Sequence, residues 1–229
     1  IFKRCGLNAI KSEASGGVFT KGKNYEFQVI ADAGEDKILV CLKCKYAINL
    51  DVANKKGGNR CEKCGGELIK KNSIEVGHTF QLGKKYSQAF DLCFTNEKGA
   101  KELAVMGCYG IGLGRLMATI VEISHDEKGI IWPSQVAPYQ AHLLEIKSRA
   151  GKIYKDLQEA NIEVLYDDRK DKSAGEKFNE ADLIGIPIRI VLSERTLKKN
   201  SAEVKRRNEK KIALVKIKNL PHFLKSIYA

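Results

Sequence analysis

A glycine-rich segment governs the interpretation of the first half of the chain: Met106-Gly-Cys-Tyr-Gly-Ile-Gly-Leu-Gly-Arg115. Residues 102–106 predict a short apolar strand before a glycine-rich turn, and residues 115–123 have helical periodicity after it. Dinucleotide-binding sites share this pattern, so the glycines alone are a weak signal. Arg115 would add a fixed positive charge to the dipole of the helix start, which suits a phosphate or a stacked purine. The alternative is that Arg115 is an ordinary surface residue.

The strands upstream of this segment differ from the buried first strand of a Rossmann unit. Residues 25–31 and 74–82 alternate polar and apolar side chains, and residues 37–40 also predict a strand. Strict alternation over residues 74–82 places His78 on one face and Glu75 on the other. From the residues alone, a core histidine is the more common interpretation of His78.

Four of the seven cysteines have the spacing of a two-knuckle zinc ribbon: Cys41-Leu-Lys-Cys44 and Cys61-Glu-Lys-Cys64. Four thiolates would fill a tetrahedral shell and leave no open position, so the spacing predicts a structural Zn²⁺ site in a ribbon over about residues 41–69. Gly65-Gly66 would let the backbone curl toward the sulfurs. Two disulfides or four unrelated free thiols are the alternatives.

The composition and charge of the chain limit the kinds of protein it can be. The chain has 229 residues, 40 basic and 28 acidic side chains and a formal net charge of +12, which favours a polyanionic partner. Residues 195–211 are the densest basic segment, with a solvated hairpin as the alternative. No segment approaches the roughly 20 apolar residues of a membrane span, and no signal peptide is visible, so we expect a cytoplasmic protein. The chain opens on Ile1 within an amphipathic segment, and we expect a missing N-terminal part.

The second half of the chain predicts a small α/β domain. Pro133 and Pro138 bracket a turn-like stretch at which we place a domain boundary. Strands and helices then alternate, which indicates largely parallel pairing. The predicted order is strand 141–146, helix 152–159, strand 162–166, helix 175–183 and strand 188–192. A hairpin across Asn208 and a last helix near Pro221 should follow.

Three strings carry a resemblance to a known family: residues 74–87, residues 106–115 and residues 125–138. Together with Asp167-Asp-Arg-Lys170 and Leu183-Ile-Gly-Ile-Pro-Ile-Arg189, they closely resemble bacterial-type prolyl-tRNA synthetases, and the resemblance covers nearly the whole chain.

The resemblance implies an α+β protein with two domains. Residues 1–138 would form the C-terminal part of a class II catalytic domain, an antiparallel sheet with the zinc ribbon inserted at about 41–69. Residues 139–229 would form an α/β anticodon-binding domain.

The resemblance also implies site residues. Arg115 would be catalytic, packing on the adenine of a bent ATP and reaching its γ-phosphate. The ATP-binding residues would be Gly110, Gly112, Gly114, Arg115 and Glu75. The proline-binding residues would be His78, Phe80 and Cys108. The anticodon contacts would be Asp168, Arg169 and Lys177, with ordinary surface charge as their alternative. Asn24 and Tyr25 depart from the family's Ser-His before Glu26, so no substrate role is assigned to that strand.

The implied reaction activates proline with ATP and Mg²⁺ and transfers it to tRNA(Pro), in a full-length homodimer. The second-motif arginine and the first-motif dimer contacts would lie upstream of Ile1, so we expect the chain alone to be inactive. Only the ribbon occupies the region where many relatives carry an editing domain, so we expect no editing in cis. A non-catalytic tRNA-binding accessory protein is the main alternative. A class II synthetase for Thr, Gly or His is a further one.

Overall fold

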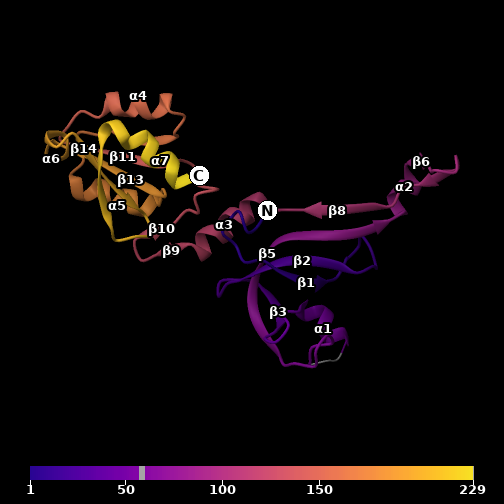
Figure 1. Ribbon diagram of the computed structural model, residues 1–229. Coiled ribbons are helices and arrows are strands. Elements are labelled where there is room, and N and C mark those ends of the chain that lie inside the picture. The colour runs from indigo at the N-terminus through magenta and orange to yellow at the C-terminus, as the bar shows by residue number, and fades with distance from the viewer. Residues whose placement is uncertain (57–59, 229) are drawn as a thin grey trace. The chain divides into compact units, whose positions relative to one another are not determined.

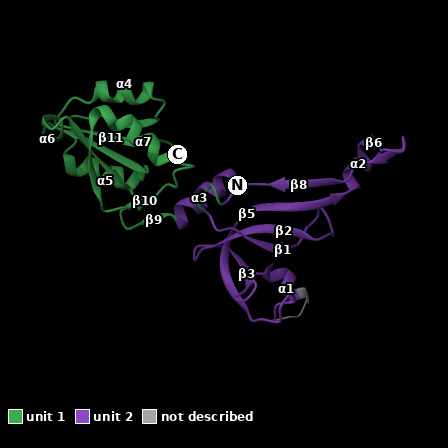
Figure 2. Ribbon diagram, viewed as in Figure 1, with its two compact units in different colours: residues 1, 3–6, 124–229 green, residues 2, 7–123 purple. Residues whose placement is uncertain are grey.

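The computed structural model describes residues 1–56 and 60–228, so residues 57–59 of the predicted ribbon lie outside the described part. The chain forms two compact units, shown in separate colours in Figure 2. The N-terminal unit comprises Phe2 and residues 7–123, and the C-terminal unit comprises residues 1 and 3–6 and the chain from Ser124 onward. The domain limit at residue 138 stays a prediction. Within the described residues, no helix has the length and apolar character needed to cross a membrane.

The N-terminal unit is built on a six-stranded sheet with the order β2-β1-β4-β3-β5-β8. Its strands are β1 (Ile10–Ala14), β2 (Asn24–Ile30), β3 (Asp36–Cys41), β4 (Ala47–Asn49), β5 (Leu68–Gly83) and β8 (Met106–Gly110). All its pairings are antiparallel except a short parallel one between β1 and β4. Because β2 also pairs with β5, five strands close into a ring. Helices α1 (Leu50–Lys56), α2 (Lys85–Ala89) and α3 (Leu113–Ile123) and the hairpin of β6 (Cys93–Thr95) and β7 (Lys101–Leu103) complete the unit.

The long strand β5 organises this unit, as Figure 1 shows. Its sixteen residues pair with β3, β2 and β8. The predicted strict alternation is wrong at one point, because the register with β2 shifts between Phe27 and Gln28 and leaves Val76 as an extra residue in β5. A bulge of this kind reverses the side-chain alternation. Glu75 and His78 are consequently neighbours and do not lie on opposite faces.

The single strand predicted over residues 102–106 is also wrong, because the two ends of this range belong to two different strands. Residue 103 ends β7, whereas Met106 begins β8, and β8 runs through Gly107 to Gly110. These glycines therefore belong to a paired strand, and the turn into α3 is limited to residues 111–112.

The C-terminal unit has a five-stranded sheet with the order β12-β11-β13-β14-β15. Its elements are β11 (Ala141–Ile146), α4 (Gly151–Glu159), β12 (Val164–Asp167), α5 (Ala174–Ile184), β13 (Ile188–Ser193), α6 (Glu194–Lys198), β14 (Ser201–Arg206), β15 (Ile212–Lys216) and α7 (Leu220–Tyr228). The first three strands of the sheet order are parallel, and β14 and β15 form the predicted antiparallel hairpin.

Helices cover both faces of this sheet. Leu157 of α4 and Leu224 of α7 are buried in the main core with the apolar side chains of β11, β13 and β14. On the other face, Ala181 of α5 packs against Leu144 and Val191. A capping box at Ser173 begins α5. The result is a three-layer α/β unit with α5 alone on one side, as Figure 1 shows.

Three of the eight basic side chains in residues 195–211, namely Arg195, Arg206 and Arg207, are paired with carboxylates of this unit. Arg195 pairs with Glu203 at 2.5 Å. Arg207 is 7% exposed and donates two hydrogen bonds to Asp126, at 2.8 and 2.6 Å. Asp126 belongs to the hairpin of β9 (His125–Asp126) and β10 (Gly129–Ile130). Charge density in the sequence therefore overstates the free positive charge here.

Burial of His142 makes the stability of this unit depend on pH. His142 is 4% exposed, and burial lowers its pKa to about 4; Asp167 opposes the shift, whereas Arg169 and Arg189 add to it. Between pH 6.5 and 4 the imidazole of residue 142 is therefore protonated in the unfolded chain but neutral in the folded one. The free energy of unfolding is highest above pH 6.5 and falls as the pH drops toward 4. Urea unfolding should show that His142→Gln removes up to about 3 kcal/mol of this pH-dependent change. Equal pH slopes in both proteins would contradict the assignment.

Candidate functional site

Three adjacent strands bring the first group of candidate residues together. Glu26 of β2 is paired with His78 of β5, and His78 is paired with Gly110 of β8. Phe80 is paired with Cys108 in the same ladder. Directly opposed residues of antiparallel strands share a face, so these side chains form one surface.

Two carboxylates and an imidazole meet on this surface. Nδ1 of His78 lies 3.7 Å from Oε1 of Glu26 and 3.7 Å from Oε1 of Glu75. Oε2 of Glu26 accepts hydrogen bonds from Gln28 at 3.0 Å and Asn49 at 3.2 Å. One ligand atom from each of Glu26, Glu75 and His78 lies within 4.8 Å of the others, which is close enough to share a cation.

The charges of this cluster are mutually dependent. Burial and the neighbouring Glu26 raise the pKa of Glu75, while Arg115 opposes the rise. Burial lowers the pKa of His78, against the effect of Glu26. A cation held between the two carboxylates would relieve their repulsion.

Arg115 lies in the first turn of α3 and reaches this cluster. Its side chain is 51% exposed, its Nη1 donates to the backbone oxygen of Glu75 at 3.3 Å, and the same Nη1 lies 3.7 Å from Oε2 of Glu75. A side chain added at Gly114 would meet no atom within 4 Å. The fold itself therefore does not require glycine at position 114, and the space beside it is open to a ligand.

Two of the candidate proline-binding residues, His78 and Phe80, are in direct contact. The rings of His78 and Phe80 stack with centroids 3.9 Å apart, and Phe19 contacts Phe80 at 5.2 Å. Nε2 of His78 is buried and has no hydrogen-bond partner among the described residues. Cys108 is exposed. A buried nitrogen without a partner is unusual in a folded protein and calls for a water or a ligand as its partner.

Glu26 and Gln28 are two further polar residues of β2 to which the sequence pattern assigned no role. Both are buried, with exposures of 9% and 0%, and Asn24 in the same strand is also fully buried. The signal was present in the sequence, because polar side chains occupy every second position of a strand whose other residues are apolar or aromatic.

The four cysteines of the predicted ribbon come together, the first two from its beginning and the last two from near its end. Sγ of Cys41 lies 3.5 Å from Sγ of Cys64, and the Cys44 and Cys61 sulfurs are also 3.5 Å apart. All four sulfurs lie within 4.8 Å of one another, and the cysteines are free thiols. Zinc with four thiolates at ~2.3 Å would hold the sulfurs about 3.8 Å apart, so the cluster has the right dimensions.

The two knuckles have the same backbone geometry. Lys45 donates its N–H to the oxygen of Cys41 at 3.0 Å, and Gly65 donates to the oxygen of Cys61 at 2.8 Å. Both donors have positive φ, 61° for Lys45 and 69° for Gly65. Only the second knuckle thus has the residue type that adopts this conformation without strain.

This asymmetry predicts opposite effects of two substitutions. Lys45→Gly should raise the free energy of unfolding by up to about 1 kcal/mol, and Gly65→Ala should lower it by roughly 1–2 kcal/mol. Thermal unfolding of the zinc-loaded protein is the measurement. Lys43→Gly, at an ordinary φ, is the matched control and should not stabilise; a rise equal to that of Lys45→Gly would refute the explanation.

The candidate anticodon residues lie at the carboxyl end of β12. Asp168 and Arg169 are exposed in the loop that follows this strand. Lys177 differs, because its side chain in the first turn of α5 is only 2% exposed. The structure brings the three residues into one region but does not present Lys177 at the surface.

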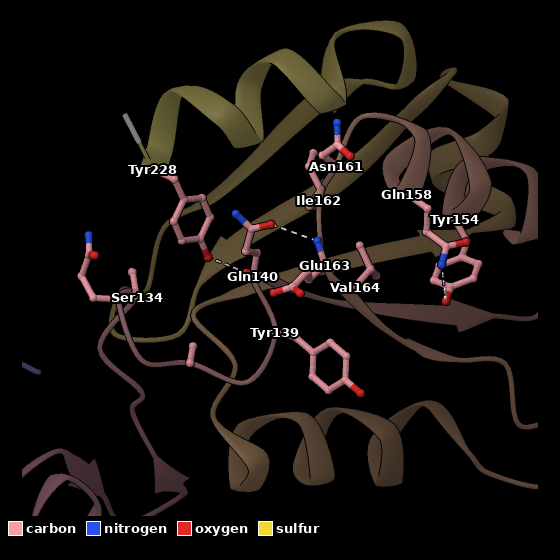
Figure 3. A pocket seen from close by; sticks show the side chains of 12 residues that line it. Ser134, Tyr139, Gln140, Tyr154, Gln158, Asn161, Ile162, Glu163, Val164 and Tyr228 are labelled. Carbon is pink, nitrogen blue, oxygen red and sulfur yellow. Dashed lines mark hydrogen bonds between the residues drawn. The ribbon is translucent and has the colours of Figure 1, made fainter. Parts of the chain in front are cut away.

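A separate hollow lies at the opposite end of β12. Its volume is about 830 Å³, and tyrosine and amide side chains dominate its lining, among them Tyr139, Gln140 and Tyr228. Figure 3 shows the Tyr228 hydroxyl, which donates to the backbone oxygen of Gln140, and the Gln140 side chain, which accepts from the N–H of Glu163. No candidate residue of the sequence analysis lines this hollow.

Comparison with known protein families identifies the class of the protein. Residues 1–124 match the family "tRNA synthetase class II core domain (G, H, P, S and T)", and residues 134–227 match the "Anticodon binding domain" family. The chain therefore belongs to the class II tRNA synthetases.

Curated relatives of the chain carry the name proline–tRNA ligase. The chain is 44% identical to the proline–tRNA ligase of Dehalococcoides mccartyi, in an alignment that covers 74% of the chain and 31% of the relative. The chain is 46% identical to the proline–tRNA ligase of Halothermothrix orenii, over 68% of the chain and 28% of the relative. With the proline–tRNA ligase of Moorella thermoacetica the identity is 42%, over 79% of the chain and 32% of the relative. The chain thus spans about a third of the length of these relatives.

Proposed function

We propose that the chain is part of a prolyl-tRNA synthetase that activates proline with ATP and transfers it to tRNA(Pro). The observation that carries the proposal is the position of Arg115, with its guanidinium at Glu75 beside the Glu26–His78 pair. Identity to proline–tRNA ligases across both domains supports it.

The reaction has two steps and needs no protein nucleophile. The proline carboxylate attacks the α-phosphorus of ATP, a P–O bond forms, and pyrophosphate leaves. A ribose hydroxyl of the tRNA then attacks the prolyl carbonyl, and AMP leaves. Catalysis consists of holding the reactants in line and compensating the charge of the phosphates.

The residues of β2, β5, β8 and α3 suit these tasks. Arg115 would bind the adenine face and the γ-phosphate, and Gly110, Gly112 and Gly114 would let the nucleotide approach the backbone. Glu75 and Glu26 supply oxygen ligands that suit Mg²⁺, which would neutralise phosphate charge when bound.

The proline pocket would be formed by His78, Phe80 and Cys108. The buried Nε2 of His78, which has no partner among the described residues, offers a hydrogen bond to the substrate, and the stacked ring of Phe80 offers an apolar wall. The small side chain of Cys108 would limit the size of the amino acid that fits.

The four-cysteine cluster would hold a structural Zn²⁺ as part of a zinc ribbon. Its thiolates fill the coordination shell, so the ion would stabilise the fold of residues 41–69 and take no part in the reaction. The short connection between β3 and β5 leaves room for this ribbon but not for a hydrolytic editing domain, and we expect no editing in cis.

The C-terminal unit would recognise the anticodon of tRNA(Pro). Asp168 and Arg169 are exposed beside the first turn of α5 and could contact splayed bases through polar edges. A cytoplasmic location and a homodimeric complete enzyme are parts of the same proposal.

Amino-acid-dependent pyrophosphate exchange tests the proposal. The full gene product should exchange pyrophosphate into ATP with proline and not with the other nineteen amino acids. Exchange with threonine, glycine or histidine would assign a different class II enzyme. Binding of tRNA without any exchange would favour the non-catalytic accessory protein.

A further inference from the structure

Lys177 carries a charge that is almost completely buried. Its side chain is 2% exposed, and its Nζ donates to the backbone oxygen of Glu145 at 2.9 Å and to that of Asp167 at 3.1 Å. The same Nζ lies 3.3 Å from Oδ1 of Asp167. A buried ammonium is costly unless its donors are satisfied, and three acceptors match its three N–H groups.

These contacts join three elements at one edge of the sheet. Glu145 belongs to β11, Asp167 is the last residue of β12, and Lys177 is in the first turn of α5. The capping box of Ser173 and Glu176 fixes the start of that helix and thereby the position of the lysine. Lys177 consequently holds the ends of two parallel strands at a fixed distance from α5.

The held carboxylate in turn orients an exposed arginine. Asp167 accepts from Nε of Arg169 at 2.9 Å, from its Nη2 at 2.8 Å and from its backbone N–H at 3.2 Å. Nη2 of Arg169 also donates to Glu180, which supports the same side chain from α5. Hydrogen bonds from Arg169 and Lys177 hold the pKa of Asp167 well below its usual range. A two-point contact of this type fixes the plane of a guanidinium, and the Arg169 side chain is still 43% exposed.

We propose that Lys177 is a positioning residue for RNA recognition, which fixes Asp167 and through it the guanidinium plane of Arg169, and that it does not contact the RNA. The inference rests on the proposed function, because it assumes that Arg169 contacts the anticodon. Every donor of Lys177 is already used inside the protein, so a direct contact would have to break the clamp between β11, β12 and α5.

A double-mutant cycle separates positioning from a direct or merely structural role. Filter binding measures the affinity of the full gene product for a tRNA(Pro) transcript and for a transcript with changed anticodon bases. Arg169→Ala should weaken binding of the tRNA(Pro) transcript by roughly 10-fold and reduce discrimination between the transcripts. Lys177→Met should produce a similar loss, and the double variant should lose no more than Arg169→Ala alone.

Two further variants keep the test decisive. Asp167→Asn removes the charge and one of the two side-chain acceptors of Arg169 while leaving the backbone acceptors of Lys177 in place. It should produce the loss of affinity expected for Lys177→Met, which keeps the test valid if that variant folds poorly. Leu157→Ala, in the core on the other face of the sheet, should lower the melting temperature without changing discrimination. Additive losses in the double variant would overturn the positioning role. An unchanged affinity in Arg169→Ala would overturn both this role and the proposed RNA contact, and it would be visible in that single variant.

Discussion

Replacement of Arg115 by alanine in the full gene product is expected to reduce proline-dependent pyrophosphate exchange by roughly 10²–10³-fold, the cost of losing one charge-stabilising donor. The guanidinium of Arg115 lies at Glu75, beside the site proposed for the nucleotide phosphates. Arg115→Lys should recover little of the activity, because an ammonium lacks the planar fork that can stack on a base and bind phosphate at two points.

The control for this variant is Arg149→Ala. Arg149 is an exposed arginine of the C-terminal unit, outside every site described above. The Arg149→Ala variant should exchange pyrophosphate at the rate of the unsubstituted protein. Equal activity of Arg115→Ala and Arg149→Ala would remove Arg115 from the catalytic role.

Replacement of Cys61 by serine is expected to abolish stoichiometric zinc binding and to expose the ribbon region to proteolysis. Cys61 is 2% exposed, and its sulfur lies 3.5 Å from that of Cys44. Structural zinc sites contribute on the order of 10 kcal/mol of binding free energy, so a segment that depends on the ion unfolds locally without it. Elemental analysis should give about one zinc per unsubstituted chain.

Cys93→Ser is the matched control for the zinc prediction. Cys93 is exposed and lies outside the four-cysteine cluster. It should leave both the zinc content and the protease pattern unchanged. A full zinc content in Cys61→Ser, or none in the unsubstituted protein, would contradict the structural zinc site.

Local patterns predicted most elements of the fold. Alternation identified β2 and the second half of β5, and the switch between strand and helix periodicity identified β11, α4, α5 and β13. Cysteine spacing predicted which four thiols meet. These features depend on residues close in sequence, or on a motif whose chemistry fixes its geometry.

The features that the sequence missed depend on pairing between distant segments. The bulge at Val76 arises from the register with β2, and this bulge is what brings Glu75 beside His78. Lys177 resembles a surface charge in its own segment, and only the carbonyls of Glu145 and Asp167 make it a buried clamp. Periodicity carries no information about either partner.

A crystal structure of the full gene product with ATP and proline would show whether Arg115 binds the nucleotide. We predict that the guanidinium of Arg115 packs on the adenine and reaches the γ-phosphate, with the proline ring against the stacked pair of His78 and Phe80. A bound nucleotide that leaves this guanidinium in bulk solvent, or that binds away from β5 and β8, would contradict it.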